Sequence, residues 1–181
     1  YHARQGSMSC YGEFSSIELN VDRGLAPALF DMALGPDGHM WLGTADTGLY
    51  RMEPSIAELI GSGNAQPEVR STPVWSEKSQ NGTNFSVDTL LFHRDKLWLA
   101  TNGGLRRLRV DGAELRSELS IRKDNGLLSN ATAGLAVSPG GNILYAGGND
   151  GMSAVDVKSG EVFDTITRDD GLVDNEIWTF P

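Results

Sequence analysis

Short acidic and amide side chains recur along this chain at regular intervals. Asn84, Asn130 and Asn175 are separated by 46 and 45 residues, and each precedes a short apolar run. Further Asp and Asn residues fill turns between apolar runs, namely Asp46, Asn102, Asn149 and Asp150. Such side chains present oxygen acceptors at short range, which suits a hydroxyl-rich ligand or a hard cation. For any single residue the preferred alternative is that Asp and Asn form the turns, so only their collective polarity predicts a binding surface.

The sequence offers little for catalysis or for a metal. His39 and His93 lie in or beside turns at the other ends of their strands, and His2 lies near the start of the chain. There is no Gly-x-Ser-x-Gly, His-Glu-x-x-His or phosphate-cradling glycine loop, and the Asp-Gly turns lack the alternating Asp ladder of a calcium loop. We therefore predict no catalytic residue, no metal site, no cofactor and no enzymatic activity.

The composition narrows the range of partners. The 181 residues carry 15 Lys and Arg against 24 Asp and Glu, a net charge of −9 that disfavours nucleic acid. No apolar run approaches the roughly 20 residues of a membrane-spanning helix. The single Cys10 cannot form an internal disulfide. Asn81 and Asn130 begin N-glycosylation sequons, which matter only if the source is eukaryotic and secretory.

The elements that position these residues form a repeat. The stretches "DGHMWLGTADTGL" (37–49) and "DKLWLATNGGL" (95–105) share a turn, a Trp in an apolar run, a Thr and a closing Gly-Leu. Asn84 lies 14 residues before Trp98, and Asn130 lies 14 before Leu144 in "GGNILYAGG". In the first unit Ala28 takes this position, and the extra residues fall in 54–80, an enlarged loop with one helical turn expected at "SIAELI". A period of about 45 residues is the blade length of several propeller families.

Each unit has the pattern of antiparallel strands. Apolar runs such as "LFDMAL" and "VDTLLF" alternate with tight turns such as "GPDG" and "NDG". Four strands per unit form a sheet that cannot bury both faces alone and must stack on its neighbours. We therefore predict an all-β fold, a β-propeller of four-stranded antiparallel blades of about 45 residues, with blades near 20–80, 81–122 and 123–168. Residues 169–181 would begin an incomplete blade with "EIWTF" as its first strand, and 1–19 hold a candidate blade-closing strand.

The stretches "DNGLLSNATAGLAVSPGGNILYAGGNDGM" and "DDGLVDNEIWTF" resemble the two-component regulator propeller repeat over most of residues 20–181. The chain departs from that pattern at Ala28, Ala100 and Leu144, where the family has Asn, Gly and Trp. The resemblance implies a propeller usually placed outside the membrane ahead of a signalling domain. We accordingly expect a piece of a larger protein in an extracytoplasmic location, periplasmic or extracellular.

Trp41 and Trp98 occupy equivalent positions of two units, and we predict that they are wedges between blades, since a large ring fills the gap between splayed sheets. The alternative is an aromatic platform that stacks on a sugar, which is the weaker hypothesis because a Trp in a central strand should point into the stack.

Three functions stay open at this stage. The leading one is a non-catalytic recognition or sensing module. Its ligand-binding face would collect the loops that lead into first strands (leading loops) and the turns between second and third strands (second turns). The Asp and Asn residues make that face locally negative, which favours a neutral glycan or another hydroxylated ligand over polyanions. The alternatives are a surface-assembly scaffold that docks other proteins through the propeller rim and, less favoured, a propeller lyase or lactonase.

Overall fold

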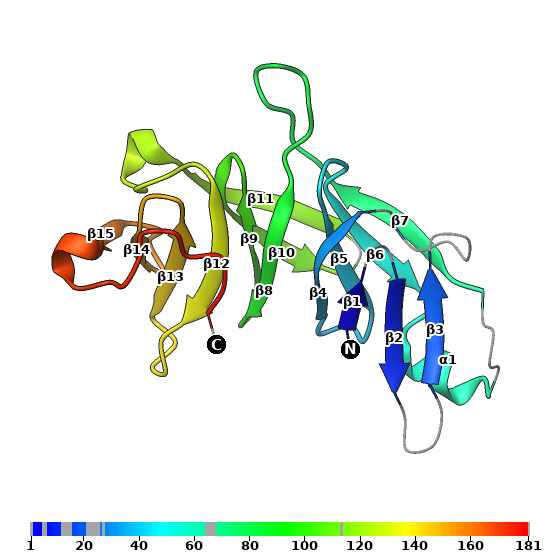
Figure 1. Cartoon of the computed structure of the whole chain (residues 1–181). Helices are drawn as coiled ribbons and strands as arrows, with labels where there is room; N and C mark the ends of the chain where they lie inside the picture. The colour runs from blue at the N-terminus through cyan, green and yellow to red at the C-terminus, as the bar shows by residue number, and fades with distance from the viewer. Residues whose placement is uncertain are drawn as a thin grey trace.

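The computed structural model describes residues 2–4, 7–11, 16–20, 26, 28–63, 68–112 and 114–180, the first three ranges by their backbone alone. Three four-stranded antiparallel sheets follow one another along the chain, each paired in sequence order (Figure 1). The predicted all-β architecture of four-stranded antiparallel propeller blades is therefore confirmed.

The first blade consists of β4 (Leu29–Leu34), β5 (Met40–Thr44), β6 (Leu49–Glu53) and β7 (Arg70–Trp75). The second consists of β8 (Val87–His93), β9 (Lys96–Thr101), β10 (Gly104–Asp111) and β11 (Glu114–Ile121). The third consists of β12 (Thr132–Val137), β13 (Ile143–Gly148), β14 (Met152–Asp156) and β15 (Val162–Ile166). Two 3-10 turns, Lys123–Asn125 and Arg168–Asp170, precede equivalent leading loops.

The stretch 54–80 is more ordered than the enlarged loop that the sequence predicts. Its expected helical turn is present as α1 (Ile56–Gly61), but residues Arg70–Trp75 also form the fourth strand of the first blade. Pro73 lies inside this strand, which is tolerated because β7 is the edge of its sheet. The prolines of this stretch favour a loop, so the sequence did not predict the strand.

The N-terminal strands form a sheet of their own. β1 (His2–Arg4), β2 (Ser7–Tyr11) and β3 (Ser16–Asn20) pair with one another in a three-stranded sheet, and a blade-closing role for this segment stays a prediction. β1 contacts β4 of the first blade. The strand predicted at "EIWTF" is absent, because residues 176–180 have no ladder partner beyond one hydrogen bond from Ile177 N to Gly148 O of 2.9 Å.

The second turns are built alike in the first two blades. Thr44 Oγ1 donates to Gly48 O at 2.7 Å, and Thr101 Oγ1 donates to Gly104 O at 2.6 Å. Gly48 and Gly104 have φ of 92° and 96°, a conformation that favours glycine. A Cβ on either would lie 2.3 Å from the carbonyl oxygen of the last residue of the fourth strand. The Gly of each Gly-Leu pair is thus required by a close backbone approach.

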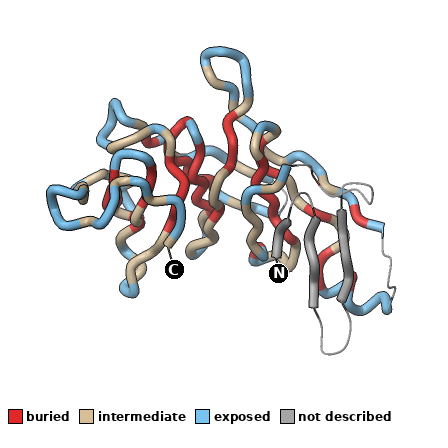
Figure 2. The backbone as a smooth tube through the Cα atoms, in the orientation of Figure 1, coloured by how far each residue is buried: buried red, intermediate tan, exposed pale blue. Residues whose placement is uncertain are grey.

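Apolar clusters join neighbouring blades, and the buried residues concentrate on their central strands (Figure 2). β8 contacts both β4 and β12. Trp41 is fully buried and packs with Val87, Leu90 and other residues of the second blade. Trp98 is fully buried and packs with residues of the third blade such as Leu135 and Leu144. Each ring therefore lies between two sheets.

We expect Trp98→Ala to lower the free energy of unfolding by about 3–5 kcal/mol, because it removes a buried ring from the contact between the second and third blades. Denaturant unfolding measures this loss. Trp41→Ala should change stability in the same direction. Trp178, which is 61% exposed, is the matched control, and Trp178→Ala should change stability by less than about 0.5 kcal/mol. A Trp98→Ala variant as stable as the control would show that this ring is not a structural wedge.

Candidate functional site

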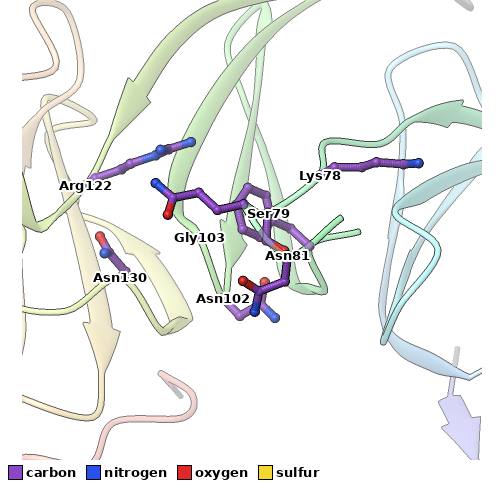
Figure 3. A pocket seen from close by; sticks show the side chains of 9 residues that line it. Lys78, Ser79, Asn81, Asn102, Gly103, Arg122 and Asn130 are labelled. Atoms are coloured by element: carbon purple, nitrogen blue, oxygen red, sulfur yellow. The ribbon is translucent and has the colours of Figure 1, made fainter. Parts of the chain in front are cut away.

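A pocket of about 380 Å³ opens between the second and third blades, on the face that holds the leading loops and second turns. Three parts of the chain line it: the leading loop of the second blade, the β9–β10 turn, and the leading loop of the third blade (Figure 3). The lining residues are Lys78, Ser79, Gln80, Asn81, Phe85, Asn102, Gly103, Arg122 and Asn130. Backbone hydrogen bonding joins the two blades here, since Gly104 N donates to Asn130 O at 2.6 Å.

The Phe85 ring, which lines the pocket, contacts two arginine side chains. The guanidinium carbon of Arg106 lies 5.4 Å from the centroid of the Phe85 ring, and that of Arg122 lies 5.9 Å from it. Gly103 leaves room for this ring, because a Cβ at Gly103 would lie 2.4 Å from two of the Phe85 ring carbons. Cation–π contacts of this kind are favourable and fix the orientation of both partners.

The Glu77 carboxylate accepts hydrogen bonds from both arginines. Arg106 donates from Nε to Glu77 Oε2 at 2.6 Å and from Nη2 to Oε1 at 3.0 Å, which is a bidentate pair. Arg122 Nη2 donates to the same Oε1 at 2.9 Å. The hydrogen bonds from Arg106, which outweigh the opposing effect of burial, hold the pKa of Glu77 below its ordinary value. Arg106 is only 1% exposed, so it depends on this carboxylate for its neutralisation.

The charge of the pocket corrects one expectation. We predicted a locally negative, acceptor-rich mouth, but the charged residues that line this pocket are Lys78 and Arg122. Glu77 carries one negative charge and bonds to two guanidinium groups, so it does not cancel both. The pocket therefore combines amide donors and acceptors with a positive charge, and it does not repel anions.

The predicted site residues divide into two groups. Asn102 and Asn130 line the pocket together with Asn81 of the first sequon. Asp46, Asn149, Asp150 and Asn175 do not line it. The Asp46 backbone oxygen accepts from Asn84 Nδ2 at 3.2 Å, and Asp150 lies 3.7 Å from Lys123 Nζ.

Two of the repeated asparagines also hold their own loops. Asn130 Oδ1 accepts from Lys123 N at 2.7 Å, and Asn175 Oδ1 accepts from Arg168 N at 2.7 Å. The equal bonds show that these positions are equivalent in the repeat. Asn102 Oδ1 accepts from Ser86 N at 3.2 Å. The loop-forming role that the sequence favours for single residues therefore applies to Asn130 and Asn175, whereas Asn102 links its turn to the leading loop of the same blade. Binding stays open for Asn102 and Asn130, which line the pocket.

Sequence reasoning missed Glu77, Phe85, Arg106 and Arg122. Glu77 precedes Arg106 by 29 residues and Arg122 by 45, and no local pattern pairs them. The "RRLR" run at 106–109 was the available signal. Its residues point to different environments, since Arg106 is buried while Arg109 is exposed.

Among the residues that the structure describes, no group of three or more His, Cys, Asp and Glu could hold a metal ion. Within the same residues, no helix is long and apolar enough to cross a membrane. His39 and His93 lie at the β4–β5 and β8–β9 turns, as predicted.

Comparison with solved structures identifies similar folds. The chain is similar to an extracellular domain assigned to the hybrid two-component system BT3049 of B. thetaiotaomicron (TM-score 0.64, 13% identity, 97% of this chain and 23% of the other). It is also similar to the extracellular domain of BT4673 from the same organism, assigned to a one-component system (0.66, 18%, 97% and 22%). A third is PorZ, a surface component of the type-IX secretion system of Porphyromonas gingivalis (0.56, 19%, 75% and 19%).

The chain thus spans about a fifth of the length of these proteins. No family model matches the sequence, and no curated protein matches it. At these identities the likeness establishes the fold.

We expect Glu77→Gln to lower the free energy of unfolding by about 1–3 kcal/mol at neutral pH, since it leaves the buried Arg106 without an anionic partner. The pKa of Glu77 lies below its ordinary value of 4.5 in the folded state. Its ionisation therefore stabilises the fold above pH 4.5, and this contribution is lost as the pH falls through the folded-state pKa.

Thermal unfolding of the wild type and of Glu77→Gln from pH 7 to pH 3 measures this pH dependence. The difference between wild type and Glu77→Gln should shrink as the pH falls, whereas the exposed Glu161→Gln serves as a control with little effect at neutral pH. A difference that stays constant across the range would contradict the assignment.

Proposed function

We propose that this chain is part of a non-catalytic recognition propeller in an extracytoplasmic sensor, and that it binds a small hydroxyl-rich ligand in the pocket between the second and third blades. The observation that carries the proposal is the lining of the pocket. Side chains from two blades converge there, and none of the lining residues is His, Cys, Asp or Glu. Groups that orient a ligand are present, while His, Asp and Glu, the commonest general acids and bases, do not line the pocket.

The lining fits a carbohydrate. Asn81, Asn102 and Asn130 offer both donors and acceptors, which sugar hydroxyls require. The Phe85 ring supplies an apolar surface among these polar groups. A volume of about 380 Å³ lies at the lower end of the range for small-molecule sites. Lys78 and Arg122 extend the ligand class from neutral glycans to glycans that carry a carboxylate.

The comparisons support a sensing role by analogy of fold. Two of the similar structures are extracellular domains assigned to two-component and one-component systems. An extracytoplasmic location and a link to signalling come to this chain from that likeness. A surface-assembly scaffold is the second candidate, because PorZ is a surface component of a secretion system.

We expect Asn102→Ala to weaken saccharide binding at least about tenfold, because it removes a lining amide whose partners would be left unpaired in the complex. The probe is a panel of neutral and uronic-acid-containing oligosaccharides, measured by calorimetry. Asn149→Ala is the matched control, since Asn149 lies on the equivalent turn of the third blade and does not line the pocket.

Equal losses in the two variants would contradict a site in this pocket. Failure of the wild-type chain to bind any member of the panel would favour the scaffold.

A further inference from the structure

A second pocket, of about 260 Å³, lies between the same two blades at the opposite ends of their strands. The β8–β9 turn lines it together with Arg107, Glu118 and the turn after β14. Four of its side chains are cations, Arg94, Lys96, Arg107 and Lys158, against the carboxylates Asp95 and Glu118. Positive charge is therefore in excess here, in a chain whose net charge is −9.

The carboxylates of this pocket are already engaged. Lys96 Nζ lies 2.7 Å from Glu118 Oε1 and 3.2 Å from Asp95 Oδ2. Glu118 Oε2 lies 3.3 Å from Arg107 Nε as an ion pair, but the contact lacks the geometry of a hydrogen bond. The other two cations of the lining, Arg94 and Lys158, thus have no carboxylate of this pocket as an ion-pair partner.

Two buried donors from paired positions of β9 and β10 lack a hydrogen-bond acceptor among the described residues. The Arg107 guanidinium stacks 5.5 Å above the Trp98 ring, and its Nη1 donates to Val157 O at 2.7 Å. Arg107 Nε and Trp98 Nε1 are both buried and have no hydrogen-bond partner among the described residues. A buried N–H without an acceptor is unfavourable, so the pair favours an added acceptor.

The first blade shows which acceptor fits. Trp41 pairs with Arg51 across β5 and β6 in the same register as Trp98 with Arg107 across β9 and β10. There the Asp37 carboxylate accepts from Arg51 Nε at 2.8 Å and from Trp41 Nε1 at 3.3 Å. Burial raises the pKa of Asp37, but hydrogen bonds led by the one from Arg51 outweigh burial and lower it below its ordinary value. One carboxylate thus satisfies both donors.

The β8–β9 turn of the second blade does not supply this carboxylate. Only two residues, Arg94 and Asp95, separate β8 from β9, whereas five residues separate β4 from β5. The residue four positions before Trp98 is Arg94, where the first blade has Asp37 before Trp41. In the third blade Leu144 pairs with Val155 at the two donor positions, so no acceptor is needed. Among the three blades as described, the second keeps both donors without a carboxylate that hydrogen-bonds to either, since Glu118 contacts Arg107 Nε only as an ion pair.

We propose that this pocket binds a small-molecule carboxylate that accepts from Arg107 Nε and Trp98 Nε1, in the role that Asp37 has in the first blade. Arg107 lines the pocket and stacks on Trp98, which is itself not a lining residue. In the first blade one carboxylate bridges the equivalent pair of donors. Lys158 is exposed and contributes positive charge at the pocket.

The test follows the indole N–H signals of the four tryptophans by NMR in the ¹⁵N-labelled chain. The Trp98 and Trp41 signals are assigned with Trp98→Phe and Trp41→Phe. Sodium acetate is titrated against sodium chloride at equal ionic strength, with sodium sulfate and inorganic phosphate in parallel. We expect a saturable shift of the Trp98 signal with acetate. The Trp41 signal should not shift, because the Trp41 indole N–H already donates to Asp37. No saturable Trp98 shift with acetate, or tighter binding of sulfate or phosphate than of acetate, would overturn the proposal.

Two variants locate the effect. Replacing residues 93–96 by the five-residue turn of the first blade, residues 35–39, introduces an internal carboxylate, and the acetate response of Trp98 should disappear. Lys158→Gln, a change at an exposed residue, should weaken acetate binding about threefold, while Arg116→Gln, at an exposed residue outside the pocket, should leave it unchanged. An acetate response unaffected by Lys158→Gln or retained in the turn-exchange variant would contradict the assigned site.

Discussion

The apolar contact between facing sheets is the interaction on which the other features of this chain depend. A four-stranded sheet with two apolar faces gains most of its stabilisation when another sheet covers them. Trp41 and Trp98 supply the largest side chains in these contacts, and both are fully buried. Because the sheets are held face to face, the turns of one blade lie beside the leading loop of the next.

Polar sites form where this contact ends. One pocket collects amides, Lys78 and Arg122 at the second turns, and the other collects cations at the opposite ends of the strands. Both are made by the second and third blades together, so neither exists in an isolated blade. The repeat holds the central strands nearly constant and lets the turns vary, which places different chemistry at equivalent positions. The Asp37 carboxylate in the first blade and Arg94 in the second are an instance of this variation.

The sequence predicts the blades well because their period is carried by local features. Apolar strands, Gly-containing turns and the Asn positions each depend on a few neighbouring residues. It fails where long-range pairing decides the outcome. β7 contains a Pro that suggests a loop, yet its residues hydrogen-bond to β6. The pocket at Phe85 was only partly predicted, because Asn102 and Asn130 belong to recognisable turns, whereas Glu77, Arg106 and Arg122 meet only in the folded chain. The negative charge expected there does not hold for this pocket, whose charged lining residues are Lys78 and Arg122.

Native-state hydrogen exchange of the backbone amides of β9 and β13 tests the central claim that the blades are joined into one unit by their apolar contact. Since Trp98 and Leu144 lie in a single buried cluster, these central strands should open together, with equal free energies of opening close to that of global unfolding. If the amides of β12–β15 exchanged through a separate opening of much lower free energy while β8–β11 stayed protected, the blades would be independent. Neither pocket would then lie at a rigid junction between the second and third blades.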